Sequence, residues 1–112
     1  MNVLFVCTLN RARSVAAERL YRRTPGLTVR SSGIDVRAAH QVNEHDLVWA
    51  EQIFVFEAAH ESWIRNTFSG DLPAIIDLGI PDDFIVDDPH LSRELRDVLQ
   101  PLLGEPGIGR RS

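Results

Sequence analysis

The sequence has a single cysteine and no lysine, and each of these facts excludes certain kinds of site. Cys7 is the only cysteine among 112 residues, so the chain cannot form an internal disulfide, a cysteine-rich zinc site or a two-cysteine redox couple. All twelve basic residues are arginine, which excludes Schiff-base chemistry and a Walker-type lysine. Any bound phosphate must therefore be held by arginine or by backbone N–H groups.

Long apolar stretches and a net positive charge are also missing. No apolar run reaches the length of a membrane span, and the N-terminus lacks the basic and apolar regions of a signal peptide, so we expect a cytoplasmic protein without a membrane partner. The net charge of -4 disfavours nucleic acid as a partner. This charge is unevenly distributed, because residues 1–30 hold six arginines and one acid whereas residues 71–97 hold eight acids and two arginines.

What remains is the composition of one ordinary globular domain over residues 1–112, with 44% hydrophobic and 25% charged residues. We expect residues 104–112 to form a flexible tail. Short apolar runs predict strands over residues 3–6, 27–32, 53–56 and 74–78. Helical patterns predict four helices. The first begins at Ser14, the second and third cover residues 44–50 and 58–68, and the last starts at Pro89.

Alternation of strands and helices predicts an α/β fold, an open four-stranded parallel sheet with helices on both faces in a Rossmann-like three-layer arrangement. Asn43 is a plausible N-cap of the second helix, and Asp88 followed by Pro89 is typical of a helix start. We expect Pro101 to end or bend the last helix. The predicted buried residues of these two helices are Leu47, Val48, Leu91, Leu95, Val98, Leu99, Leu102 and Leu103.

The segment between the first strand and the first helix carries the chemistry. In parallel α/β sheets ligands bind beyond the carboxyl ends of the strands, and Cys7 lies at such an end. A loop of this length can point several N–H groups at one anion, with the helix N-terminus beneath and the Arg13 guanidinium closing over it. The same field favours a nucleophilic thiolate at Cys7. Ser14 can cap the helix or donate its hydroxyl to the sulfur. The remaining candidate phosphate-binding residues are Thr8, Leu9, Asn10, Arg11 and Ala12.

The segment from Val3 to Ser14 resembles the N-terminus of low-molecular-weight protein tyrosine phosphatases, in which an apolar strand is followed by Cys, two residues, Asn, two residues, Arg and Ser. The resemblance continues through Ser31-Ser32-Gly33 and through the third strand, which ends in the acid Glu57, and is greatest to a short bacterial branch of the family. It implies the phosphatase fold and a phosphate-binding loop. Leu9 stands where the family usually has glycine, which implies some backbone adjustment.

An acid must protonate the leaving group, and the family supplies it from an Asp-Pro-Tyr loop near the C-terminus. Asp88-Pro89-His90 matches that motif best by spelling, but a capping carboxylate is tied to backbone N–H groups. The family's spacing to the last helix favours Asp82 instead, with Phe84 where the family has its aryl-stacking tyrosine. Asp83 beside it adds a negative charge that would favour the protonated acid. Asp83 and Asp88 remain alternatives.

The leading hypothesis is hydrolysis of phosphotyrosine or a related aryl phosphate through a phosphocysteine intermediate, with no cofactor and no metal. The expected partners are a phosphorylated protein or small aryl phosphate and inorganic oxyanions. Two alternatives stay open: arsenate reduction that depends on an external thiol, and a non-catalytic module that binds phosphate or phosphopeptides. The histidines, including His60, have no metal-ligand spacing and are expected at the surface or as satisfied buried residues.

Overall fold

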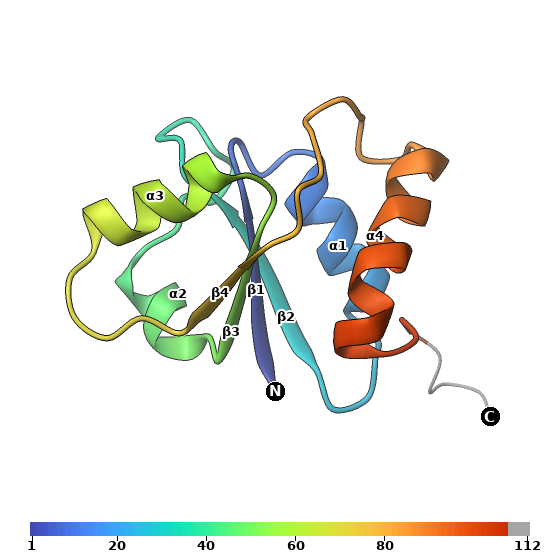
Figure 1. Cartoon of the computed structure of the whole chain (residues 1–112), viewed down its shortest axis with the longest axis horizontal. Coiled ribbons are helices and arrows are strands. Elements are labelled where there is room, and N and C mark those ends of the chain that lie inside the picture. Colours follow the sequence, from blue (N-terminus) through green and yellow to red (C-terminus); the bar gives the residue numbers. More distant parts are fainter. Residues whose placement is uncertain (108–112) are drawn as a thin grey trace.

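Four parallel strands form the centre of the molecule, and the chain returns between them through helices (Figure 1). The computed structural model describes residues 1–107. The strands are β1 (Asn2–Cys7), β2 (Thr28–Gly33), β3 (Gln52–Val55) and β4 (Ala74–Asp77), in the order β2-β1-β3-β4. The helices are α1 (Arg13–Tyr21), α2 (Glu44–Trp49), α3 (Ala58–Thr67) and α4 (Pro89–Leu103). The predicted open parallel sheet is confirmed, with each element within a few residues of its expected position.

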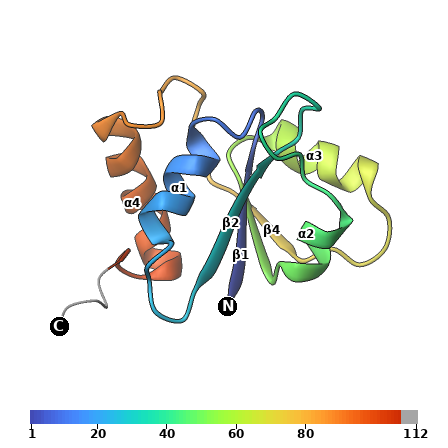
Figure 2. The same cartoon turned by 180° about the vertical axis from the view of Figure 1, so that it is seen from behind.

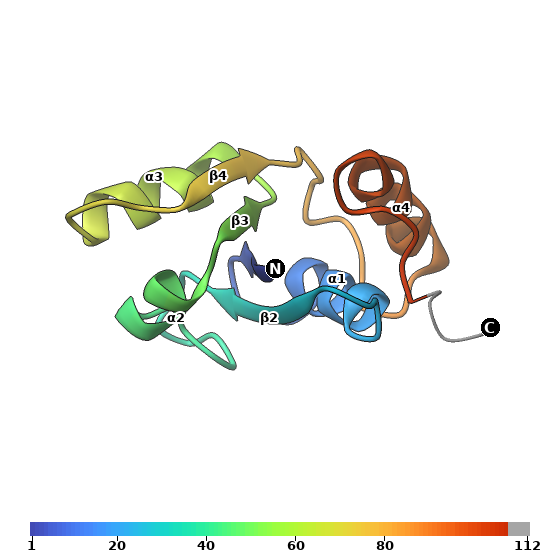
Figure 3. The same cartoon turned by 90° about the horizontal axis from the view of Figure 1, so that it is seen from below.

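Helices cover both faces of the sheet. Viewed from below, α1 and α4 lie on one side of the strands and α2 and α3 on the other (Figure 3). From behind, β2 is the edge strand nearest the viewer, and β1 is the next strand of the sheet (Figure 2). Strand β1 pairs with β2 and β3 along its two edges, and helices cover its two faces, so its residues from Val3 to Cys7 are buried. This burial explains the uninterrupted apolar run.

Two hydrophobic clusters form the core, one on each face. Successive residues of β1 divide between them, because side chains alternate along a strand. Val3, Phe5 and Cys7 pack with residues of α1 and α4, and the ring centroid of Phe5 lies 5.6 Å from that of Phe54. Leu4 and Val6 join the cluster on the other face, with residues of α2 and α3. The sheet is thus held from both sides close to the strand that carries the only cysteine.

The predicted starts of α2 and α4 are confirmed. The Asn43 side chain accepts from the Asp46 N–H, and the Asp46 carboxylate accepts from the Asn43 N–H, which forms a capping box. Asp88 accepts from the His90 N–H at 2.9 Å, with Pro89 at the first helical position.

Two predictions of burial on these helices are wrong. Val48 is 86% exposed, because α2 is a six-residue helix with its inner side at Asp46 and Leu47. Leu102 is 48% exposed at the last turn of α4.

The C-terminal segment packs against α1 and the turn that follows it. Pro101 lies inside α4 without ending it, and the helix runs on to Leu103. Gly104 O accepts from the Tyr21 hydroxyl at 2.9 Å, and the Gly107 N–H donates to Thr24 Oγ1 at 2.6 Å. The first residues of the expected tail therefore make tertiary hydrogen bonds, and residues 108–112 of that prediction lie outside the described residues.

The carboxyl ends of the strands meet at one edge of the sheet. Cys7 is in register with Gly33, and Val55 lies between Val6 and Asp77. Four connections leave this edge, over residues 8–12, 34–43, 56–57 and 78–88 (upper edge in Figure 1). The segments that are basic and acidic in sequence are therefore brought together, as the site requires.

Candidate active site

Residues 7–14, which we call the cradle, turn from the end of β1 into α1. Ser14 does not cap this helix: the N-cap position falls on Ala12, which makes no side-chain cap, so the capping alternative for Ser14 is wrong. Asn10 has a left-handed backbone with φ of 55°, a conformation that asparagine tolerates better than most residues. Because the positive φ falls on Asn10, Leu9 does not need the freedom of the glycine usual at its position.

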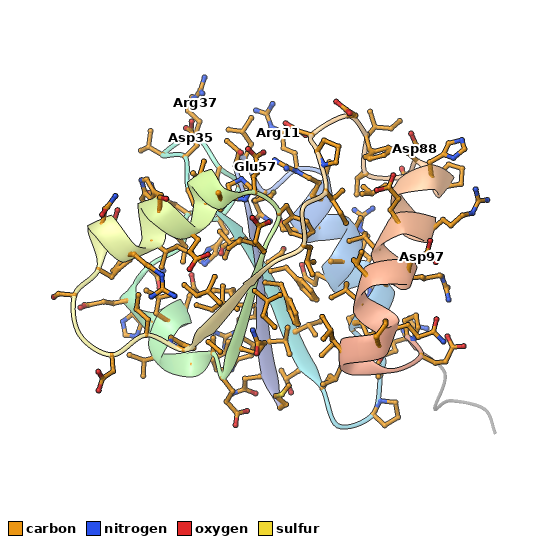
Figure 4. All side chains as sticks on the ribbon, viewed as in Figure 1. Arg11, Asp35, Arg37, Glu57, Asp88 and Asp97 are labelled. Carbon is orange, nitrogen blue, oxygen red and sulfur yellow. The ribbon has the colours of Figure 1, made fainter. Side chains whose placement is uncertain are left out.

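The segment after β2 supports the cradle. Backbone N–H groups of residues 34, 35 and 39 donate to the carbonyls of Cys7, Thr8 and Leu9 at 3.0, 3.0 and 3.3 Å. Within this segment Asp35 accepts three hydrogen bonds from Arg37, and these lower the pKa of Asp35 to about 2 (Figure 4). The supporting turn therefore keeps its charged pair throughout the neutral range.

Gly33 lets β2 approach the cradle. A Cβ atom at this residue would lie 2.6 Å from the Thr8 carbonyl oxygen and 2.9 Å from the Asn10 nitrogen, both closer than real Cβ contacts. Glycine is therefore the residue that the packing of β2 against the cradle requires.

The Cys7 sulfur lies at the end of a hydrogen-bond chain. Asn10 Nδ2 donates to Ser14 Oγ at 2.9 Å, and Ser14 Oγ lies 3.0 Å from Cys7 Sγ. Since the serine oxygen already accepts from the amide, its proton is available to the sulfur. All three residues are buried. The arrangement therefore offers the Cys7 sulfur a hydroxyl group as a hydrogen-bond partner.

Arg13 is 1% exposed and is fixed along one edge of its guanidinium. Nη1 donates to Glu57 Oε2 at 2.8 Å and to the Ile80 carbonyl at 2.9 Å. The opposite edge makes only long contacts, from Nη2 to Thr8 Oγ1 at 3.5 Å and from Nε to Asp82 Oδ1 at 3.8 Å. Two parallel N–H groups on such an edge match two oxygens of a tetrahedral anion.

A pocket of about 390 Å³ opens over the cradle. Phe84, Ile85 and Val86 give it an apolar wall, and Arg11, which is exposed, adds a positive charge. Arg11 and Glu57 lie at the carboxyl edge of the sheet in Figure 4, whereas Asp88 lies at the first turn of α4. The residues that line the pocket are Cys7, Thr8, Leu9, Arg11, Ala12, Arg13, Asp82, Phe84, Ile85 and Val86.

His60 lies behind the cradle, at the start of α3, and is 1% exposed. Its Nδ1 accepts from the Phe56 N–H at 3.2 Å, and its Nε2 lies 3.0 Å from Thr8 Oγ1. Burial, followed by the charge of Arg13, lowers the pKa of His60 to about 4. The imidazole is therefore neutral at pH 7, and the 3.8 Å approach of Nε2 to Glu57 is not an ion pair.

Two findings within residues 1–107 bear on the class of site. No three Asp, Glu, His or Cys side chains there are grouped so that they could hold a metal ion. None of the helices in this part of the chain combines the length and the apolarity needed to cross a membrane.

Comparisons with known proteins rest on structure alone. No protein-family model matches the sequence, and no curated protein sequence matches it. Among solved structures, a low-molecular-weight protein tyrosine phosphatase from Streptococcus pyogenes has a TM-score of 0.71 at 16% identity, over 91% of this chain and 93% of the other. The low-molecular-weight protein tyrosine phosphatase from T. tengcongensis is similar as well, with a TM-score of 0.65 at 19% identity, over 91% of this chain and 99% of the other. The YwlE arginine phosphatase from Geobacillus stearothermophilus has a TM-score of 0.60 at 21% identity over 89% and 86%.

The chain has the low-molecular-weight protein tyrosine phosphatase fold. The fold that the resemblance implied is thereby confirmed.

This phosphatase fold brings together most of the residues singled out in the sequence. Asp82 and Phe84 line the same pocket as Cys7 and Arg13, although more than 65 residues separate the two segments. Asn10 and Ser14 lie beneath the pocket rather than in its wall.

The alternative acids are placed elsewhere. Asp83 is exposed and does not line the pocket, and Asp88 is occupied as the cap of α4. Of the three candidate acids, only Asp82 approaches Arg13.

Sequence reasoning assigned no role to two residues that support this site. Glu57, at the N-cap position of α3 just after β3, binds the Arg13 guanidinium, and His60 binds Thr8. An acid directly after a buried strand, at the edge where Cys7 also ends its strand, was the available signal for Glu57. His60 gave none, because its two partners become neighbours only when β1 and β3 pair.

Proposed function

We propose that the protein hydrolyses aryl phosphate monoesters such as phosphotyrosine, with Cys7 as nucleophile, Arg13 and the cradle backbone as phosphate ligands and Asp82 as general acid and base. The observation that supports this most directly is the meeting of three groups in one pocket: a thiol beside a hydroxyl, a guanidinium edge that makes only long contacts, and a carboxylate. The anion is then held by arginine and the cradle backbone, without any lysine.

The first step transfers the phosphoryl group to sulfur. The Cys7 thiolate attacks phosphorus, so a P–S bond forms while the ester P–O bond breaks. Protonated Asp82 gives its proton to the departing oxygen, and the phenol leaves. The Nε and Nη2 groups of Arg13 and the cradle N–H groups stabilise the charge on the transferred oxygens.

The second step regenerates the enzyme. The Asp82 carboxylate takes a proton from water while the water oxygen attacks phosphorus, and the P–S bond breaks to return the thiolate. Inorganic phosphate leaves. The Ser14 hydroxyl stabilises the thiolate both as attacking group and as leaving group.

The pocket wall favours an aromatic leaving group. Phe84, Ile85 and Val86 offer apolar surface on which an aryl ring is desolvated, and a ring can stack on Phe84. One structural neighbour is an arginine phosphatase, so phosphoarginine is the natural competitor. The leaving group of phosphoarginine is a guanidine that departs as a cation, and Arg11 at the pocket opposes a second positive charge. We therefore infer a preference for phosphotyrosine.

Hydrolysis of p-nitrophenyl phosphate by the wild type and Cys7→Ser tests the proposal. We expect turnover to fall by roughly 10⁴-fold or more in Cys7→Ser while inorganic phosphate still binds. Acid quench of the wild type during turnover should trap phosphate on Cys7. An unchanged rate in Cys7→Ser would contradict the mechanism.

The same assay separates the alternatives. Phosphate binding without turnover by the wild type would favour a binding module, and arsenate-dependent consumption of an added thiol would favour an arsenate reductase. Comparison of phosphotyrosine with phosphoarginine, at equal enzyme concentration, tests the substrate preference.

A further inference from the structure

The buried pair of Thr8 and His60 is not explained by the mechanism above. Thr8 follows the nucleophile and lines the pocket, whereas His60 is buried behind it on α3. A buried polar side chain needs a partner on each polar atom, and His60 has one on each ring nitrogen. The orientation of the ring is therefore fixed.

The directions of these hydrogen bonds follow from their chemistry. The backbone N–H of Phe56 can only donate, so His60 Nδ1 is the acceptor and carries no proton. In the neutral imidazole the proton is then on Nε2, which donates to Thr8 Oγ1 at 3.0 Å. Arg13 Nη2 donates weakly to the same oxygen at 3.5 Å.

The Thr8 hydroxyl proton is left to point into the pocket. Its oxygen already accepts two hydrogen bonds, and within residues 1–107 no protein acceptor lies within hydrogen-bond distance of this hydroxyl. Thr8 lines the pocket over Cys7 and Arg13. The hydroxyl thus faces the region that a phosphate oxygen would occupy against Arg13 Nη2.

We propose that the Thr8 side chain donates a hydrogen bond to an oxygen of the bound phosphate, and that His60 is a positioning residue that aims this hydroxyl. The proposal rests on the proposed function, because it names a further ligand of the same phosphate. It gives Thr8 a side-chain role beside the backbone role expected for the whole cradle.

Binding of inorganic phosphate by titration calorimetry tests the proposal without any need for turnover. We expect Thr8→Val, which keeps the shape and removes the hydroxyl, to raise the dissociation constant by about tenfold, as expected for a hydrogen bond to a charged group. Thr8→Ser should restore binding to within about threefold of the wild type. Thr28→Val, at an exposed residue of β2, is the matched control.

His60→Gln tests the positioning role. It should weaken phosphate binding by about threefold to tenfold when Thr8 is present and add nothing in the Thr8→Val background, because the two residues act through one hydroxyl. His45→Gln, at an exposed residue of α2, controls for the loss of an imidazole. With p-nitrophenyl phosphate as substrate, Thr8→Val and His60→Gln should each raise KM more than they lower kcat. A merely structural defect in the cradle would instead lower kcat.

The outcomes separate the two proposals. Equal phosphate binding by Thr8→Val and the wild type would overturn the side-chain role of Thr8 and leave the proposed function intact. Additive effects of the two substitutions would overturn the positioning role of His60. If the wild type fails to bind phosphate, the proposed function is wrong and this inference with it.

Discussion

The cradle and residues 79–87, which we call the acid loop, line the same pocket but are held in different ways. In the cradle Cys7, Asn10, Arg13 and Ser14 are all buried. In the acid loop only Ile80 is buried, the Asp82 side chain is 63% exposed and Ile85 is 74% exposed. The cradle is a product of core packing, whereas the acid loop is anchored mainly where the Ile80 carbonyl meets Arg13.

Because the cradle is buried and the acid loop is exposed, substitutions in the two segments should affect stability differently. Buried hydrogen-bonded groups contribute to the folded state, and their removal leaves unsatisfied partners. Exposed loop residues contribute little, and the Arg19–Asp87 ion pair of the acid loop, 3.4 Å long and exposed, adds little more. We therefore expect changes in the cradle to lower both binding and stability, and changes in the acid loop to lower turnover alone.

Among these substitutions Arg13→Lys should have the largest effect, with losses of both activity and stability as expected for a buried cradle residue. Lysine keeps the charge beside Glu57 but loses the planar fork that holds two phosphate oxygens. We expect kcat/KM to fall by about 10²–10³-fold and the free energy of unfolding to fall by roughly 1–3 kcal/mol. Urea denaturation and aryl phosphate kinetics measure both. Full stability together with lost activity would break the proposed coupling.

Asp82→Asn should show the opposite signature. Loss of the general acid and base should lower kcat by about 10²-fold or more, while phosphate binding and the urea midpoint stay close to wild type because the side chain is exposed. Asp88→Asn makes the same chemical change at the start of α4, where asparagine caps as well as aspartate, and should leave kcat nearly unchanged. A larger loss in Asp88→Asn would overturn the assignment of Asp82.

Arg11→Gln probes the exposed rim of the cradle, where buried packing no longer dominates. Removal of this charge should raise KM for phosphotyrosine by roughly twofold to fivefold at low salt. The difference should shrink at high salt, because exposed charges are screened. A salt-independent change in KM would show instead that Arg11 shapes the pocket.

The smallest expected effect is the pH dependence of stability that buried His60 gives to the support of the cradle. The pKa of His60 is lowered from 6.5 to about 4 in the fold, mainly by burial. Between these values the unfolded chain binds a proton that the folded chain does not, so this contribution to stability is complete above about pH 6.5 and is lost as the pH falls toward 4. Urea midpoints at several pH values should therefore fall more steeply for the wild type than for His60→Gln. Parallel curves would contradict the burial of a neutral His60.

Local signals explain what the sequence could predict. The alternation of apolar runs and helical patterns, the Asn43 cap and the Asp88-Pro89 start lie within a few neighbouring residues, and all are confirmed. The family's spacing favours Asp82, and the expected capping role counts against Asp88, which the structure has in that cap. The support for Arg13 and Thr8 could not be predicted, because Glu57, Ile80 and His60 lie 44, 67 and 52 residues from their partners. Such pairs are set by strand order rather than by any local pattern.

The close approach at Gly33 has a consequence for the order in which the protein is made. The sequence from Cys7 to Ser14 is synthesised before its partners, because its carbonyls are bound by N–H groups of residues 34–39 and Arg13 is held by Glu57 and Ile80. The cradle residues are thus synthesised well before the site they form can be completed. A nascent chain that carries every cradle residue still has no enzyme site until the sheet has closed behind it.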